Sequence, residues 1–204
     1  MIVIVDYNLG NKGSISNMIK KIGYEAIVTD DIAIIEKADK LILPGVGAFD
    51  DGMRNLSNLG LIPILKQKVL QDKTPILGIC LGMQLLCNSS EEGELPGIGF
   101  LNTSVIRFPK DISGIKLRIP HLGWNTVSKN NTSTLLNGIE NPRFYFVHSY
   151  YCLAQDSTYK VENTSFGLSF HSYIQHENIY GVQFHPEKSH SNGKKLLQNF
   201  IELS

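Results

Sequence analysis

The sequence predicts an α/β fold with a mostly parallel central sheet, helices on both faces, and an antiparallel or mixed β extension in the second half. Over the first 90 residues, short apolar runs alternate with segments of helical periodicity. These apolar runs are continuous, which is typical of strands buried on both faces. From residue 100 to 182 the chain is rich in Thr, Ser, Tyr, Phe and Val, with Gly, Asn and Pro breaks, which favours further strands.

The first half alternates strand and helix. The expected strands are 2–6, 25–29, 40–45 and 74–80, and the expected helices are 12–23, 31–38, 59–73 and 81–90. The first helix is the clearest, because Ile15, Met18, Ile19 and Ile22 recur at helical spacing and Gly23 can cap it. In a parallel sheet of this kind, functional residues gather at the carboxyl ends of the strands.

The second half has a different pattern. The segments expected to form strands are "FLNTSVIRF" (100–108), "RFYFVHSYY" (143–151), "FGLSFHSYI" (166–174) and "NIYGVQF" (178–184). A last helix is expected over 190–203, where Leu196, Leu197, Phe200 and Ile201 have helical spacing. Since no linker, repeat or low-complexity stretch divides the sequence, we expect a single domain over residues 1–204.

Composition narrows the function classes. The chain has 19 Lys and Arg against 19 Asp and Glu, so it lacks the basic excess that binds nucleic acid or an anionic membrane. No apolar run approaches the roughly 18–20 residues of a membrane span, and the N-terminus resembles a first strand rather than a signal peptide. Cys80, Cys87 and Cys152 form no CxxC pair, which argues against a zinc site or a disulfide framework. We expect a cytoplasmic protein without metal or cofactor.

"LGICLGMQ" (77–84) places Cys80 between an expected strand and an expected helix, with a glycine two residues away on each side. This arrangement has the shape of a nucleophile elbow, in which small neighbours let strand and helix pass close together. The helix that begins at Leu81 favours the thiolate, and the Leu81 amide can donate to an oxyanion. Taken alone, the turn fits a packing corner around a small apolar side chain equally well.

Two other segments complete a possible site. In "GVQFHPEKS" (181–189), Pro186 keeps His185 extended, so that Glu187 lies on the same face and can orient the imidazole. In "LPGVGAF" (43–49), an amide of Val46 or Gly47 can join Leu81 in an oxyanion hole. The alternatives are a surface turn for the first segment and an ordinary strand-to-helix turn for the second.

Together, "GICLGMQLL" (78–86), "LPGVGAF" and "GVQFHPEKS" resemble the class I, triad-type glutamine amidotransferases. "IPHLGWN" (119–125), "YFVHSYY" (145–151) and "DYNLGN" (6–11) are similar, more narrowly, to the glutaminase subunits of imidazole glycerol phosphate synthases. The resemblance runs from residue 2 to near the C-terminus and implies a flavodoxin-like layout. One departure is Asn8, where such subunits often have glycine, although Asn tolerates left-handed backbone angles.

The resemblance implies a role for each matching residue. Cys80 matches the nucleophile, His185 the general base and acid, and Glu187 the orienting carboxylate. The implied oxyanion positions are Gly47, Val46 and Leu81, and the implied glutamine-binding positions are Gly45, Gln84, Glu92 (with Glu91 as its competitor), Ser149 and Tyr150. The implied reaction is attack of the thiolate on the side-chain amide of glutamine, release of ammonia, and hydrolysis of a γ-glutamyl thioester.

The sequence contains no second active site for the ammonia, because it has neither a phosphate-binding loop nor a GxGxxG motif. The resemblance implies a (β/α)8-barrel partner in a heterodimer that receives ammonia through a tunnel and makes imidazole glycerol phosphate for histidine biosynthesis. The implied interface residues are Asn8, Asn11, Pro120, His121, Trp124, Asn125, Tyr145 and Lys188. For Trp124 a core position beside a glycine turn is the alternative.

Two other functions stay open at this point. "GSISNMIKKIG" (13–23) is also similar to paralogues that deliver ammonia to a divergent barrel partner in surface-sugar biosynthesis. A flavodoxin-like protein without hydrolytic activity could instead use Cys80 as a thiol sensor, since accessible thiols of low pKa suit that role. Gln84, Glu92 and the pairing of His185 with Glu187 argue against the sensor, which needs none of them.

Overall fold

The computed structural model describes residues 1–129, 133–154 and 157–203. Five parallel strands form the first part of the main sheet, in the order β2 (Ala26–Thr29), β1 (Ile2–Val5), β3 (Lys40–Leu43), β4 (Ile76–Ile79) and β14 (Ile179–Val182). The last strand of the chain therefore lies directly beside β4, the strand that leads into Cys80. This parallel core confirms the predicted fold class.

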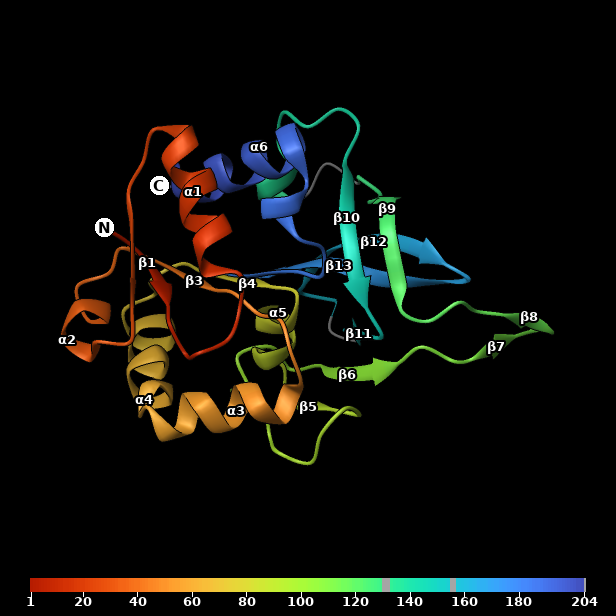
Figure 1. Ribbon diagram of the computed structural model, residues 1–204, viewed down its shortest axis with the longest axis horizontal. Helices are drawn as coiled ribbons and strands as arrows, with labels where there is room; N and C mark the ends of the chain where they lie inside the picture. Colours follow the sequence, from red (N-terminus) through yellow and green to blue (C-terminus); the bar gives the residue numbers. More distant parts are fainter. Residues whose placement is uncertain (130–132, 155–156, 204) are drawn as a thin grey trace.

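The antiparallel part continues from β14 in the same sheet. It contains β13 (Leu168–His176), β11 (Tyr150–Leu153) and β6 (Ser104–Arg107), with β12 (Lys160–Phe166) paired to β13. At its edge, β5 (Ser89–Ser90) pairs with β6 in parallel. Two ribbons lie outside it: β9 (His121–Thr126) with β10 (Arg143–His148), and β7 (Asp111–Ile112) with β8 (Ile115–Lys116). The expected β extension is confirmed, and Figure 1 shows it on the side away from the two termini.

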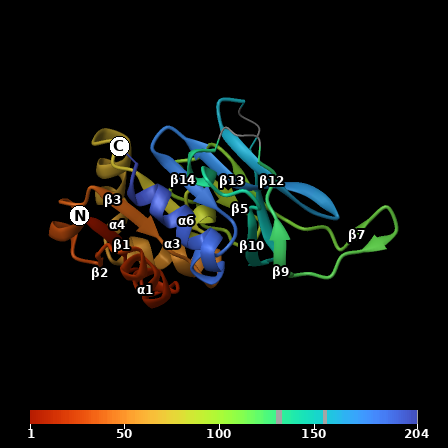
Figure 2. The same ribbon diagram turned by 90° about the horizontal axis from the view of Figure 1, so that it is seen from above.

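Helices cover both faces of the parallel strands, as predicted. On one face lie α1 (Lys12–Ile22) and α6 (His190–Ile201), and on the other lie α3 (Phe49–Asn58) and α4 (Leu61–Lys66), as Figures 1 and 2 show. Alternate residues of β1 divide between the two layers: Ile4 packs with the cluster of α1 and α6, and Val3 with the cluster of α3 and α4. Both strand faces are buried, which explains the continuous apolar runs.

Some element boundaries differ from the sequence prediction. The expected helix 59–73 is α4 followed by a π-helical turn at Gln67–Gln71, and α5 ends at Leu85 because the chain turns into β5. Helix α3 is absent from the prediction, although Phe49, Met53 and Leu56 bury one face at helical spacing. The remaining helical segments are α2 (Ile32–Ile35), the 3-10 turn η2 (Thr134–Leu136) and the 3-10 turn η3 (Pro186–Lys188).

Candidate active site

Cys80 lies at the carboxyl end of β4, immediately before α5 (Leu81–Leu85). Its backbone has φ 53° and ψ −109°, an unusual conformation for a residue with a side chain. The Cys80 amide donates to the Val182 carbonyl at 2.8 Å, so the pairing of β4 with β14 holds the turn in place. The side chain is 7% exposed. This is the geometry of the predicted elbow.

The flanking glycines are required by close packing. A Cβ on Gly82 would lie 1.9 Å from the Leu43 carbonyl oxygen, and a Cβ on Gly78 would lie 2.7 Å from the Met83 amide nitrogen. Helix α5 therefore sits directly against the ends of β3 and β4. The two readings of the turn are both correct in part, because the glycines serve packing and that packing presents Cys80 at the sheet edge.

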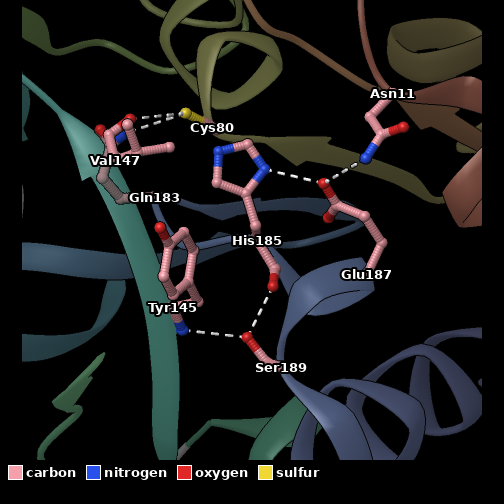
Figure 3. Close-up of polar contacts among 8 residues, drawn as sticks. All are labelled: Asn11, Cys80, Tyr145, Val147, Gln183, His185, Glu187 and Ser189. Carbon is pink, nitrogen blue, oxygen red and sulfur yellow. Dashed lines mark hydrogen bonds and ion pairs between the residues drawn. The ribbon is translucent and has the colours of Figure 1, made fainter. Parts of the chain in front are cut away.

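His185 and Glu187 form a buried pair, which Figure 3 shows beside Cys80. His185 Nδ1 lies 2.8 Å from Glu187 Oε1, and each of the two side chains is 1% exposed. The backbone of His185 is fixed as well, because its amide donates to the Tyr145 carbonyl at 2.9 Å and its carbonyl accepts from the Ser189 hydroxyl at 2.6 Å. His185 Nε2 has no hydrogen-bond partner among the described residues.

The surroundings of His185 favour its charged form. Burial by itself lowers the pKa of His185, but the neighbouring Cys80, together with the hydrogen bond and charge of Glu187, outweighs it and raises that pKa to about 10. Asn11 Nδ2 lies 3.5 Å from Glu187 Oε1, a marginal contact that adds a polar neighbour to the carboxylate. An imidazolium beside a thiol is suited to hold a thiolate and to give a proton to a leaving group.

A cavity of about 300 Å³ opens in front of Cys80. Its walls are Val46, Gly47, Cys80, Leu81, Gln84, Glu92, Val147, His148, Ser149, Tyr150 and His185. All three expected oxyanion residues and four of the five expected glutamine-binding residues thus share one cavity with Cys80 and His185. Gly45 is the exception, because it packs against α5, where a Cβ would lie 2.3 Å from the Gly82 amide nitrogen.

Gln84 offers less to a ligand than a free amide would. Both of its side-chain N–H groups are used within the protein, since Nε2 donates to the Tyr150 carbonyl at 3.1 Å and to Gln183 Oε1 at 3.0 Å. Only Oε1 is left for the cavity, so Gln84 can accept a hydrogen bond from a ligand but not donate one. From the sequence alone, the Gln84 side-chain amide could have either donated or accepted a hydrogen bond, so the structure restricts its role.

Glu92 lies opposite the N-terminus of α3. Its Oε2 accepts from the Phe49 amide at 3.1 Å. Burial, helped by the charges of Asp50 and Asp51, raises the pKa of Glu92 despite that hydrogen bond. Glu91 is exposed and its carboxylate accepts from the Arg107 amide at 2.7 Å, so Glu91 is occupied elsewhere. Of the two adjacent acids, Glu92 is the one that lines the cavity.

Two further histidines form a hydrogen-bonded pair behind the cavity. His148 Nδ1 lies 2.7 Å from the Tyr150 carbonyl oxygen, and His148 Nε2 lies 2.9 Å from His121 Nδ1. Burial lowers the pKa of His148 to about 3 and that of His121 to about 4. His121 is 4% exposed and stacks on Phe146, so its side chain packs in the core, and its expected interface role stays a prediction.

The other expected interface residues differ in exposure. Trp124 is 38% exposed, its ring stacks on His190 at 5.3 Å, and it meets Tyr145 edge-on at 6.0 Å. Lys188 lies over the Tyr145 ring at 5.8 Å. Pro120 is exposed and Asn125 is half-buried. Asn8 is exposed and has φ 65°, a left-handed conformation that fits a position where similar subunits often have glycine. Trp124 is therefore no core residue.

Three residues beside Cys80 were missed by the sequence analysis. Gln183 Nε2 donates to Cys80 Sγ at 3.6 Å, and the Val147 carbonyl lies 3.8 Å from the same sulfur. His148 lines the cavity, although its sequence context suggests only a structural or surface role. Gln183 is two residues before His185, so its place in the motif was a usable signal.

Within the described residues, no cluster of three or more His, Cys, Asp or Glu side chains could hold a metal ion. In the same part of the chain, no helix has the length and apolar character needed to cross a membrane.

Fold and site together define an α/β protein with a thiol at a strand–helix elbow and a histidine–carboxylate pair facing it. Residues 3–203 match the family model for class-I glutamine amidotransferases, and the chain belongs to that family. It is 58% identical to "Imidazole glycerol phosphate synthase subunit HisH 2" of Methanococcus maripaludis, over 99% of both chains. It is 45% identical to "Imidazole glycerol phosphate synthase subunit HisH" of Bdellovibrio bacteriovorus, over the full length of both.

Solved structures agree on the fold. A "glutamine amidotransferase" crystal structure superposes with a TM-score of 0.76 at 18% identity, over 99% of this chain and 98% of that one. The structure of PurLQS from Thermotoga maritima superposes with a TM-score of 0.73 at 20% identity, over 98% of this chain and 96% of that one.

Proposed function

We propose that this chain is the glutaminase subunit of an imidazole glycerol phosphate synthase and hydrolyses L-glutamine to glutamate and ammonia. The observation that carries the proposal is the placement of Cys80 and His185 at one cavity of about 300 Å³, with Glu187 bonded to His185 at 2.8 Å. The names of the full-length relatives support the assignment to histidine biosynthesis. The biosynthetic role and the lack of a membrane-spanning helix among the described residues fit a cytoplasmic location.

The proposed reaction has two halves. Cys80 Sγ attacks the side-chain amide carbon of glutamine, and amides of Leu81 and of the Val46–Gly47 segment hold the oxyanion. His185 gives its proton to the nitrogen, ammonia leaves, and a γ-glutamyl thioester remains. His185 then takes a proton from water, which attacks the thioester and releases glutamate and the thiolate. One oxyanion donor contributes about 3 kcal/mol to lowering such a barrier.

The amino-acid end of glutamine is expected at the Gln84 and Glu92 side of the cavity. The Glu92 carboxylate can pair with the substrate ammonium, and Gln84 Oε1 can accept one of its hydrogen bonds. Ser149 and Tyr150 line the same part of the cavity. A ligand without the ammonium would leave Glu92 unpaired, so we expect a preference for free glutamine over a simple amide.

We infer a docking face for a (β/α)8-barrel partner on the β9 side of the site. Leu122 and Trp124 project from the same side of β9 and are 62% and 38% exposed. Tyr145 contacts Trp124, and Lys188 lies over the Tyr145 ring, so both extend this surface. The surface reaches the site because His185 donates its amide to the Tyr145 carbonyl and Glu187 directly precedes Lys188. Exposed aromatic and apolar side chains beside a basic one are typical of interface centres.

The test is glutaminase turnover of the purified chain with and without its barrel partner. Cys80→Ala should abolish glutamate release, whereas Cys87→Ala, as the matched control, should retain it. A glutamine-analogue electrophile should label Cys80 when partner and acceptor ligand are present. Glutamate release by Cys80→Ala, or no labelling in the complex, would sink the proposal and leave the thiol-sensor function standing.

A second candidate is a glutaminase that supplies a divergent barrel partner in surface-sugar biosynthesis. The similarity of "GSISNMIKKIG" to such paralogues favours it. In addition, the names of two relatives, from Methanococcus maripaludis and Pseudomonas aeruginosa (58% and 44% identical), carry the number 2. The barrel protein that co-purifies with the chain separates the two candidates. Ammonia-dependent formation of imidazole glycerol phosphate by the complex supports the role in histidine biosynthesis. A complex that does not form this product but binds a sugar-nucleotide acceptor supports the role in surface-sugar biosynthesis.

A further inference from the structure

Gln183 is buried beside the nucleophile and has no role in the proposed chemistry so far. It is 0% exposed, and Figure 3 shows its side chain beside Cys80 and Val147. Its Nε2 donates to Cys80 Sγ at 3.6 Å. Because this side-chain amide is buried next to the sulfur, its effect on Cys80 depends on whether its nitrogen or its oxygen faces Sγ.

The hydrogen-bond network answers this question. The Tyr150 carbonyl can only accept, so the Gln84 atom 3.1 Å away must be the donor Nε2. The other hydrogen of Gln84 Nε2 points to Gln183 at 3.0 Å, which must therefore present its acceptor, Oε1. Gln183 Nε2 is then left facing Cys80. A flipped Gln183 amide would set donor against donor at Gln84, so the orientation follows from the backbone carbonyl of Tyr150.

Several groups compete at the sulfur of Cys80. The Val147 carbonyl lies 3.8 Å from Sγ and favours the protonated thiol, because a carbonyl can only accept a hydrogen bond. His185 favours the thiolate through its positive charge. Tyr7, from the end of β1, is fully buried with a raised pKa, and stays neutral. His148, across the cavity, is neutral as well, and the Glu187 charge is paired with His185.

We propose that Gln183 is a further catalytic residue that holds the Cys80 sulfur as a thiolate by donating a hydrogen bond to it, with Gln84 as the positioning residue that orients Gln183. A donor bonded to the charged form of an acid stabilises that form. Such a bond is charge-assisted, and its donor Gln183 is fully buried, where hydrogen bonds are stronger than in water. The same donor helps the thiolate to leave when water hydrolyses the thioester, so it serves both halves of the reaction. This inference rests on the proposed glutaminase function for its catalytic meaning, but not for its test.

The test follows alkylation of Cys80 by iodoacetamide in the free subunit as a function of pH, with the modified peptide identified by mass spectrometry. Gln183→Leu should move the midpoint of the rate profile upward by about one pH unit, which is a roughly tenfold slower reaction below the midpoint. Gln183→Glu, which adds a negative charge at the same place, should move the midpoint further. Gln175→Leu is the matched control, because Gln175 is buried but contacts Thr134 and Tyr173 instead. Equal midpoints for wild type and both Gln183 variants would overturn the inference.

A measurement on the wild-type chain avoids any loss of folding in the variants. The side-chain amide NMR signals of Gln183 should move with the same pH midpoint as Cys80 alkylation, and Cys80→Ala should abolish that movement. Signals that titrate identically in Cys80→Ala would contradict the inference. Glutaminase assays on the complex keep the two proposals apart. If the wild-type complex has no turnover, the proposed glutaminase function is wrong but the role of Gln183 at the thiolate is not affected. If the complex is active and its Gln183→Leu variant keeps the wild-type kcat and alkylation profile, only the proposed role of Gln183 is wrong.

Discussion

Two buried histidines line one cavity, and their pKa values are shifted in opposite directions. His185 faces a carboxylate and a thiol, and its pKa is raised to about 10. His148 faces a backbone carbonyl and a second imidazole, and its pKa is lowered to about 3. Both are removed from water, so burial alone does not decide the charge of a histidine. The neighbouring charges decide it: Cys80 and Glu187 outweigh burial and raise the pKa of His185, whereas no anionic partner offsets the burial of His148.

The largest expected effect comes from removing the charged histidine. His185→Asn should lower kcat/KM for glutamine in the complex by about 10³-fold, because no other group at the cavity can give a proton to the leaving nitrogen. His176→Asn is the matched control, since His176 lies on β13 outside the cavity. Activity of His185→Asn within tenfold of the control would contradict the assignment of roles in the comparison.

A smaller loss is expected from changing only the partner of His185. Glu187→Gln keeps the shape of the side chain but removes the charge that steadies the imidazolium, so turnover should fall by about 10²-fold. The pKa of His185, followed by NMR of its ring protons, should fall toward the value of an ordinary histidine. If that pKa stays near 10 in Glu187→Gln, the carboxylate is not the cause of the difference between the two histidines.

The neutral histidine is expected to matter for stability first. His148→Phe fits the surrounding rings of Phe108 and Phe170 but leaves the His121 Nδ1 donor buried without its acceptor. The free energy of unfolding should therefore fall by about 1–3 kcal/mol. Urea denaturation of His148→Phe against His176→Phe measures the difference, and equal midpoints would show that the histidine pair contributes nothing.

The sequence analysis succeeded where the chemistry is local. Cys80 with its glycines, and His185 with Glu187, lie within a few residues of each other in two segments, so residue type and spacing were enough to predict their geometry. The role of Gln183 depends on Gln84 and on the Tyr150 carbonyl, which only the pairing of distant strands brings together. The resemblance of 119–125 implied an interface role for both His121 and Trp124, but the two residues lie an odd number of positions apart on β9 and so face opposite sides of the strand.

The fold shows the same division. The parallel strands were predicted because their apolar runs are continuous, whereas α3 was missed because Asp50, Asp51 and Gly52 interrupt its apolar positions. The charged form of His185 was indicated by its local partner Glu187, two residues away. The neutral form of His148 was not predicted, because its partners, the Tyr150 carbonyl and His121, and its burial are supplied by the fold.

The pH dependence of stability changes only gradually with each pH unit, and the two histidines act on it in opposite pH ranges, an acid limb and an alkaline limb. For His148 the folded-state pKa is lowered, so the unfolded chain binds protons first, and stability is lost as pH falls from 6.5 toward 3. For His185 the folded-state pKa is raised, so its contribution is complete below pH 6.5 and is lost as pH rises toward 10. Each group contributes a slope of at most about 1.4 kcal/mol per pH unit.

Urea denaturation at several pH values separates these limbs by difference between variants, which cancels the contributions of other titrating groups. His148→Phe should flatten the acid limb only in part, because the buried His121, whose pKa is lowered to about 4, still contributes to it. The alkaline limb should stay unchanged, because His185 keeps Cys80 and Glu187 as neighbours. Glu187→Gln should flatten the alkaline limb only. If His148→Phe alters the alkaline limb, the two histidines are coupled through the cavity, and their opposite charges are then a property of one network rather than of two separate environments.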